Sequence, residues 1–181
     1  MNDQTKSGLT DDELAIEPTV FAPDALNNQV FVVSGGAGGI GRAVAWLFAR
    51  LGAHVALVGR DKSKLDALVA GLASRKLKAS AHLADIRDAD AVNALFESVF
   101  TTNDRLDGLI NSAGGQFPQQ AIDFSVKGWN AVIDTNLNGT WYMMQAAAQR
   151  WRDRKQKGSI VNIVVVTTHG VYGIAHSIAA R

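Results

Sequence analysis

The chain has 181 residues, 47% of them hydrophobic and 19% charged, which is enough for one compact α/β domain. Its net charge of +1 gives no electrostatic reason to expect a nucleic-acid partner, and it has no cysteine for disulfide or thiolate chemistry. No apolar run approaches the ~20 residues that span a bilayer, and the polar start lacks the core of a secretory signal, so we expect a cytoplasmic protein without a membrane partner.

Residues 1–28 are predicted to be an acidic extension in front of the domain. Asp11, Asp12 and Glu13 contribute to its charge, and Pro18 and Pro23 interrupt it. A polar segment of this kind is expected to lie loosely ordered on the domain surface.

From residue 29 onward, short apolar runs alternate with helical patterns. The predicted strands cover residues 30–33, 54–58, 79–83, the neighbourhood of 109–110 and 159–166, and the predicted helices cover 40–51, 64–74, 89–100 and 126–152. With right-handed crossovers, this alternation predicts an α/β fold with a doubly wound parallel sheet of Rossmann type over residues 29–181. The last run has few alternating polar positions, which predicts a strand buried on both faces. Helix-packing roles are expected for Trp46, Trp129, Trp141 and Trp151.

A glycine-rich turn joins the first strand to the first helix of this domain. Its sequence fits two registers, one with Gly36, Gly38 and Gly41 and a wider one with Gly35, Gly39 and Gly41. A strand that turns through glycines into a helix points backbone N–H groups outward, and the helix dipole adds positive potential. The turn therefore predicts a site for the pyrophosphate of a dinucleotide.

The second strand is followed by Gly59, Arg60 and Asp61. An acidic residue directly at this strand end would bind the ribose hydroxyls of NAD, but Gly59 holds that position. The Arg60 guanidinium could instead bind a 2′-phosphate, while Asp61 could face solvent at the start of the next helix. The pattern favours NADP(H).

Five motifs then occur in order, namely Ser34-Gly35-x-x-x-Gly39-Ile40-Gly41, Asp85-Ile86, Asn111-Ser112-Ala113-Gly114, Asn136-Leu137-x-Gly139 and Gly158-Ser159-Ile160-Val161-Asn162-Ile163. Together they resemble the short-chain dehydrogenase/reductase family across residues 29–181. The resemblance implies that Asp85 contacts the adenine edge, that residues 111–114 approach the cofactor ribose, and that Asn136 holds a water near the active centre. The predicted cofactor-binding residues are Ser34, Gly35, Gly38, Gly39, Ile40, Gly41, Arg60, Asp85, Ile86, Asn111, Ala113 and Gly114.

The chain departs from this family at its usual Tyr-x-x-x-Lys signature and at the serine that precedes it. Ser177 and Arg181 stand where the tyrosine and lysine are expected, and Val165 stands at or near the serine position. Together with Gly114-Gly115-Gln116-Phe117 and His176, this arrangement resembles the trans-2-enoyl-CoA reductases and related dienoyl-CoA reductases. That resemblance implies NADPH-dependent reduction of a carbon–carbon double bond conjugated to a thioester.

The substitution fits this chemistry. Hydride delivery to the β-carbon leaves negative charge on the thioester oxygen, which needs hydrogen-bond donors more than a strong acid. We expect Ser177 to supply a donor, Arg181 to orient the nicotinamide ribose, and Asn136 to hold a water that relays a proton; these three are the predicted catalytic residues. His169 and His176 are weaker candidates for thioester or pyrophosphate contact, and no cluster has metal-ligand spacing.

Two other functions stay open at this point. One is an alcohol or carbonyl oxidoreductase that uses Tyr172 as its acid, and the other is an NADP-binding domain without catalysis. The resemblance also implies a domain that is incomplete after its fifth strand, since Arg181 falls in the first turn of a helix, and a homo-oligomeric full-length form, either dimer or tetramer. A peroxisomal location is also compatible with the resemblance.

Overall fold

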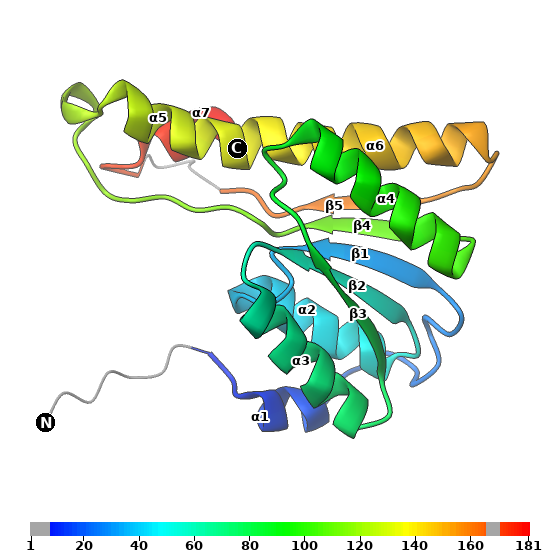
Figure 1. The fold of residues 1–181 in the computed structure, drawn as a ribbon. Helices are drawn as coiled ribbons and strands as arrows, with labels where there is room; N and C mark the ends of the chain where they lie inside the picture. Colours follow the sequence, from blue (N-terminus) through cyan, green and yellow to red (C-terminus); the bar gives the residue numbers. More distant parts are fainter. Residues whose placement is uncertain (1–7, 166–170) are drawn as a thin grey trace, which may run out of the picture.

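The computed structural model describes residues 8–165 and 171–181, and its centre is a parallel sheet (Figure 1). The strands are β1 (Val30–Ser34), β2 (His54–Gly59), β3 (Lys78–Leu83), β4 (Gly108–Asn111) and β5 (Ser159–Asn162). They lie in the order β3-β2-β1-β4-β5, and every neighbouring pair is parallel. The chain builds outward from β1 to β3 and then returns to the other side of β1, so the topological switch lies between β1 and β4. The predicted doubly wound sheet is confirmed.

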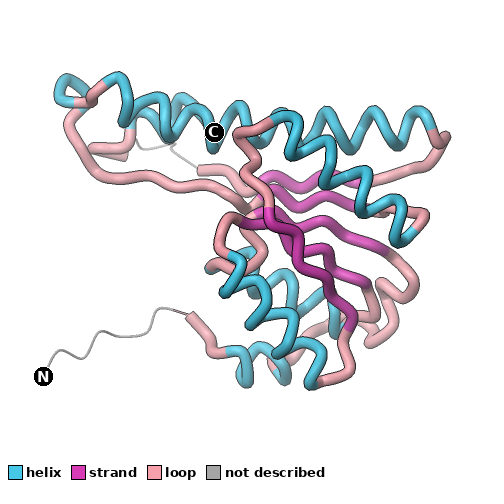
Figure 2. Tube along the Cα trace, in the orientation of Figure 1, coloured by secondary structure: helices cyan, strands magenta, loops and turns pink. Residues whose placement is uncertain are grey.

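Helices cover both faces of this sheet (Figure 2). Their bounds are α1 (Asp11–Ile16), α2 (Gly39–Arg50), α3 (Lys62–Ser74), α4 (Ala89–Asn103), α5 (Val126–Ile133), α6 (Thr140–Asp153) and α7 (Ala175–Ala180), with a short 3-10 turn η1 (Ala121–Asp123). One apolar core joins the sheet to α4 and α6, and a second joins the opposite face to α1, α2 and α3. Burial of both faces explains the continuous apolar sequences of β1 and β2.

The helix predicted over 126–152 is divided. A π-helical turn, η2 (Asp134–Gly139), separates α5 from α6. Two contacts accompany it: the Asn136 side chain binds the backbone of Gly115, and Gly139 lies against Ile86, where a Cβ atom would be 2.7 Å from Ile86 Cγ1. π-turns of this type often mark functional sites, and this one borders the strand ends.

The prediction for the last strand is wrong in two respects. β5 ends at Asn162 rather than continuing toward residue 166, which itself lies outside the described residues, and its residues are exposed rather than buried on both faces. The reason is position, because within the described sheet β5 is an edge strand that pairs only with β4.

The described part of the N-terminal extension, residues 8–28, is more ordered than its composition predicts. Helix α1 begins with a complete capping box between Thr10 and Glu13. Asp11 then accepts hydrogen bonds from Arg42 and from Trp46 Nε1 (2.9 Å) on α2, and Leu14 is buried in the core. Residues 10–16 are therefore docked on the domain, because the acidic side chains find cationic partners there.

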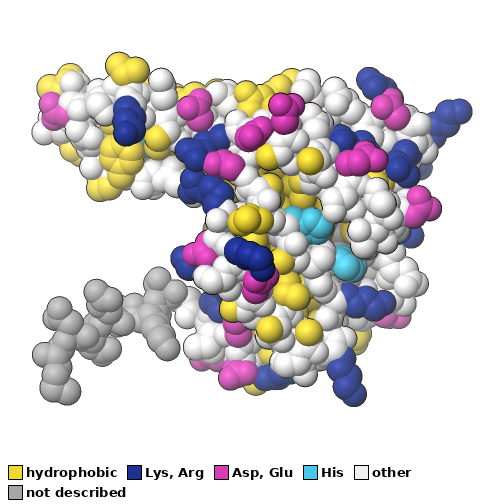
Figure 3. All heavy atoms as spheres, in the orientation of Figure 1, with side chains coloured by type: hydrophobic (Ala, Val, Ile, Leu, Met, Phe, Trp, Pro, Cys, Tyr) yellow, Lys and Arg dark blue, Asp and Glu magenta, His cyan; other side chains and the backbone are white. Residues whose placement is uncertain are grey.

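Two of the four tryptophans are partly exposed in this structure rather than buried in the core. Trp46 and Trp151 are buried, as predicted, whereas Trp129 and Trp141 are 36% and 53% exposed. They belong to an exposed apolar row, the α5–α6 stripe, formed by Val126, Trp129, Leu137 and Trp141. Figure 3 shows hydrophobic side chains along the upper, helical layer of the molecule, with basic and acidic side chains scattered over the whole of that face.

Candidate functional site

The glycine turn lies at the switch point between β1 and β4. Gly35 has a left-handed φ of +67°, and a Cβ atom there would be 2.8 Å from the backbone of Ala113. A Cβ atom on Gly41 would be 2.3 Å from the carbonyl oxygen of Gly35. A Cβ atom on Gly36 would also be close, 2.9 Å from Leu57 Cδ2, but positive φ angles occur at Gly35 and Gly39 (+31°), which belong only to the wider register, so the backbone favours Gly35, Gly39 and Gly41.

A buried polar network holds the strand ends behind this turn. The Ser34 hydroxyl donates to Asn111 Oδ1 (3.4 Å) and accepts from the Ala113 N–H (3.2 Å). Asn111 Nδ2 in turn donates to Asn162 Oδ1 (2.9 Å) on β5. Ser34, Asn111 and Gly41 line neither of the cavities described next, so the structure places these three as supports of the site rather than as its surface.

Two adjoining cavities open at the carboxyl ends of the strands, with volumes of about 360 Å³ and 660 Å³. We call the smaller one, bounded by Val58, Ala84, Asp85 and Ile86, the nucleoside cavity, and the larger one, bounded by the glycine turn, the central cavity. The walls that they share are Gly35, Gly59, Arg60, Ala113, Gly114, Gly115 and Gln116. The structure thus brings most of the predicted cofactor-binding residues together, and Gly38, Gly39 and Ile40 line the central cavity.

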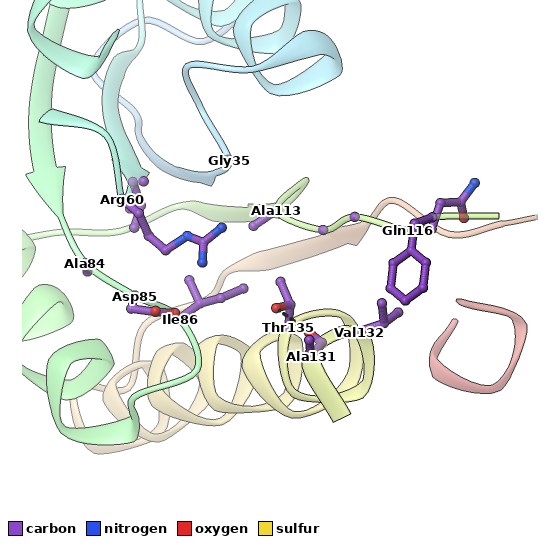
Figure 4. Close-up of a pocket in the computed structure, with 15 residues that line it drawn as sticks. Gly35, Arg60, Ala84, Asp85, Ile86, Ala113, Gln116, Ala131, Val132 and Thr135 are labelled. Carbon is purple, nitrogen blue, oxygen red and sulfur yellow. Dashed lines mark hydrogen bonds between the residues drawn. The ribbon is translucent and has the colours of Figure 1, made fainter. Parts of the chain in front are cut away.

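Arg60 extends into this cleft, as Figure 4 shows, and Asp61 also lines the central cavity, but its carboxylate is held by its own helix. Asp61 Oδ1 caps helix α3 by accepting from the Lys64 N–H (3.1 Å), and it also accepts from the Ser63 hydroxyl (2.7 Å). These hydrogen bonds, that of Ser63 foremost, lower the pKa of the Asp61 carboxyl. The Asp61 carboxylate therefore caps α3 at the wall of the central cavity, whereas Arg60 is the one of the two that also lines the nucleoside cavity.

Asp85 and Ile86 form the far wall of the nucleoside cavity. Arg87, which the sequence reasoning missed, binds the Asp85 carboxylate through Nε (2.9 and 3.0 Å) and Nη2, and its backbone N–H adds a bond of 3.0 Å. These bonds lower the pKa of Asp85, with a smaller contribution from the positive charge of Arg60. The Asp-x-Arg spacing was a readable signal for this pair, since both side chains lie beyond the end of one strand.

Arg181 lines the central cavity and meets Asn136, which is buried behind it and lines neither cavity. The Asn136 amide closes a ring with Gly115, accepting from its N–H (3.0 Å) and donating to its carbonyl (2.9 Å). Arg181 Nη2 lies 3.4 Å from Asn136 Oδ1 and covers Gly114, where a Cβ atom would be 1.6 Å from that nitrogen. Burial lowers the pKa of the Arg181 guanidinium. These two predicted catalytic residues are thus brought together.

Ser177 does not join them. Its hydroxyl is fully buried in α7 without a hydrogen-bond partner among the described residues, and it lines neither cavity. The neighbouring His176 packs edge-on to Phe117 (4.7 Å between ring centroids) and against Phe124 (4.3 Å). His169 lies outside the described residues. Tyr172 is 85% exposed and lines neither cavity, whereas Val165 lines the central cavity.

Among residues 8–165 and 171–181, no group of three or more His, Asp or Glu side chains has the geometry to hold a metal ion. Within the same residues, no helix has both the length and the apolar character needed to cross a bilayer. His54 and His82 are joined through the Ser80 hydroxyl (3.0 and 2.9 Å), and burial lowers the pKa of both imidazoles.

Residues 29–179 match the sequence model of the family described as short chain dehydrogenase. The chain belongs to the short-chain dehydrogenase family. This short-chain dehydrogenase is 34% identical over 157 residues to a probable 2,4-dienoyl-CoA reductase of Bacillus subtilis, with 86% of this chain and 62% of the relative covered. It is 35% identical to a peroxisomal 2,4-dienoyl-CoA reductase of Arabidopsis thaliana, with 79% and 50% covered. The chain thus spans less than two thirds of the length of either relative.

Solved structures of the family superpose closely on this short-chain dehydrogenase. The citronellol catabolism dehydrogenase of Pseudomonas aeruginosa matches with a TM-score of 0.85 and 35% identity, over 90% of this chain and 66% of that one. A metagenomic short-chain oxidoreductase in complex with NADP matches with a TM-score of 0.80 and 32% identity, over 86% of this chain and 71% of that one.

Proposed function

We propose that this short-chain dehydrogenase is an NADP(H)-dependent oxidoreductase that reduces a carbon–carbon double bond conjugated to a CoA thioester. The observation that carries the substrate class is that Ser177 in α7 and Arg181 at its C-cap stand where carbonyl-reducing members of the family are expected to hold tyrosine and lysine. The two dienoyl-CoA reductases among its relatives support the same class.

The residues of the cleft fit NADP(H). Arg60 would bind the 2′-phosphate, the amides at the start of α2 would bind the pyrophosphate, and Asp85 with Ile86 would hold the adenine. The relative solved with NADP supports this choice. When bound, the nicotinamide supplies a hydride to the substrate.

The chain's own residues would then manage charge and protons. Reduction at the β-carbon puts negative charge on the thioester oxygen, and the Ser177 hydroxyl, which has no partner among residues 8–165 and 171–181, is a donor that could bind it. Because Ser177 lines neither cavity, this step requires α7 to shift when substrate enters. Arg181 would orient the cofactor ribose and keep the site positive. Asn136, fixed on Gly115, would hold the water that returns a proton to the α-carbon.

A second candidate is the oxidation of an alcohol or the reduction of a carbonyl. It is favoured by the likeness to the citronellol catabolism dehydrogenase. The exposed Tyr172 does not supply an acid inside either cavity, which is why we place this function second. A third possibility is an NADP-binding domain without catalysis.

One assay separates these functions. Oxidation of NADPH is followed with a 2,4-dienoyl-CoA, crotonyl-CoA, citronellal and a simple ketone as substrates. We expect turnover of the CoA thioesters above that of the carbonyl compounds. Faster turnover of citronellal or the ketone would favour the second candidate, and tight NADPH binding without any turnover would favour the third.

We also propose that the protein is a cytoplasmic homo-oligomer in which a second copy covers the α5–α6 stripe. Two exposed tryptophans in one apolar row are unusual for a surface that stays in water. Residues of this kind are enriched at the centre of protein interfaces.

A further inference from the structure

Arg87 and Asp85 form a two-pronged ion pair on the wall of the nucleoside cavity. The guanidinium donates through Nε and Nη2 to both carboxylate oxygens, and the Arg87 backbone N–H donates to Oδ1 (3.0 Å). Such a fork fixes the plane of a carboxylate, which a single point charge cannot do.

The two side chains lie on different sides of this wall. Asp85 lines the nucleoside cavity, whereas Arg87 does not; both line a neighbouring cavity of about 480 Å³ beside Asp134 on η2. Arg87 therefore holds Asp85 from behind, and it leaves the cavity side of the carboxylate open to a ligand.

Arg60 faces the same nucleoside cavity from the next strand end, as Figure 4 shows. An uncompensated carboxylate here would attract the Arg60 guanidinium and repel a phosphate. It would also be free to rotate away from a base lying between the apolar walls Val58 and Ile86. The Arg87 fork removes both problems, because it supplies the counter-charge and fixes the orientation.

We infer that Arg87 is a positioning residue for cofactor selection. It aims Asp85 as an acceptor at the exocyclic amino group of a purine, and it keeps Arg60 available for a 2′-phosphate. This inference rests on the proposed binding of NADP(H). A carboxylate accepts hydrogen bonds only, so it selects adenine, which offers an amino group, over hypoxanthine, which offers a carbonyl oxygen at the same place.

The test measures dissociation constants by fluorescence titration for NADPH, NADH and reduced nicotinamide hypoxanthine dinucleotide phosphate. In the wild type we expect NADPH to bind about tenfold or more tightly than either analogue, the scale of one charge-assisted hydrogen bond. For each analogue, the ratio of its dissociation constant to that of NADPH measures the preference. Arg87→Gln is expected to bring both ratios close to one. Arg87→Lys keeps the charge without the fork, so it should retain the preference over NADH and lose the preference over the hypoxanthine analogue.

The chain offers a matched control at the opposite end of the sheet. Arg105 binds Asp107 with the same fork over the same spacing (2.8 and 2.6 Å), but neither residue lines the nucleoside or the central cavity. Arg105→Gln should leave both ratios at their wild-type values.

Unchanged ratios in Arg87→Gln, with NADPH still bound by the wild type, would overturn this inference alone. Failure of the wild type to bind NADPH would overturn both the proposed function and the inference that rests on it.

Discussion

Gly41 lies so close to Gly35 that a Cβ atom would be 2.3 Å from the Gly35 carbonyl oxygen. The contact brings the start of α2 directly onto the turn after β1. The backbone amides at that start are the groups expected to bind a pyrophosphate. Loop shape and anion binding are therefore properties of the same two residues.

Gly41→Ala should displace this turn. We expect at least a tenfold loss of NADPH affinity by titration, on the order of 1.4 kcal/mol or more, and a lower midpoint of thermal unfolding. Gly71→Ala is the control, because Gly71 lies inside α3 with only ordinary contacts for a new Cβ atom. That change should leave NADPH affinity intact and stabilise the helix by about 0.5–1 kcal/mol. Undiminished binding by Gly41→Ala would contradict the pyrophosphate site.

Ser177→Ala should separate stability from activity. The buried hydroxyl has no partner among the described residues, so its removal is expected to be neutral or to raise the free energy of unfolding by up to about 1–2 kcal/mol. If the hydroxyl binds the thioester oxygen, kcat on an enoyl-CoA should fall about 10²–10³-fold. Urea unfolding and NADPH oxidation measure the two effects. Full activity in this variant would remove Ser177 from the mechanism.

The imidazoles of His54 and His82 make stability depend on pH. Burial lowers the pKa of both in the folded state. As pH falls below the unfolded value of about 6.5, the unfolded chain therefore takes up protons first and the free energy of unfolding decreases. Water screens these half-buried rings, so the slope should stay well under the limit of about 1.4 kcal/mol per pH unit for each imidazole.

Urea unfolding at pH 7.5, 6.5 and 5.5 measures this slope. The Asp61 and Asp85 carboxyls have a lowered pKa in the folded state. Their contribution to the free energy of unfolding is therefore lost only as pH falls through that folded pKa, below this window. A double variant, His54→Gln with His82→Gln, should flatten the curve. An equally steep curve in the double variant would assign the slope to other groups.

Trp141→Lys should weaken self-association. The change puts a charge into the α5–α6 stripe, where burial against a second copy would be unfavourable. We expect sedimentation velocity to show a dimer or tetramer for the wild type and a shift toward monomer for the variant, with NADPH affinity preserved. Ile122→Lys, at an exposed apolar residue in η1 outside the stripe, is the control. An identical distribution of species for wild type and Trp141→Lys would exclude the stripe as the interface.

Much of the fold was readable because its signals are local. The apolar runs of β1 and β2 and the glycines of the turn after β1 are visible in short stretches of sequence. The structure confirms the elements that they predict. The exposure of β5 was not readable, since it depends on which strands flank it rather than on its own residues. The docking of α1 was missed for a related reason, because Asp11 is stabilised by Arg42 and Trp46 from a distant part of the chain.

The same distinction applies to the candidate site. Residues such as Gly35 and Arg60 could be predicted from their place at strand ends, where all ligands of such a sheet converge. The separate roles of residues that are adjacent in the sequence could not be predicted. Whether Asp61 caps a helix or binds ribose depends on the Ser63 and Lys64 hydrogen bonds, and whether Ser177 faces the cleft depends on the packing of α7.

The most direct test of the account is the dissociation constant of NADPH and of NADH for the wild type, Arg60→Ala and Asp61→Asn. Asparagine keeps the capping oxygen, so Asp61→Asn is a control one residue away. We predict that Arg60→Ala weakens NADPH binding about 10- to 100-fold, the scale of a charge-assisted contact to phosphate, while NADH binding changes little and Asp61→Asn resembles the wild type. Equal losses of affinity for NADPH and NADH in Arg60→Ala, or a loss of NADH binding in Asp61→Asn, would contradict the role of Arg60 in binding the 2′-phosphate.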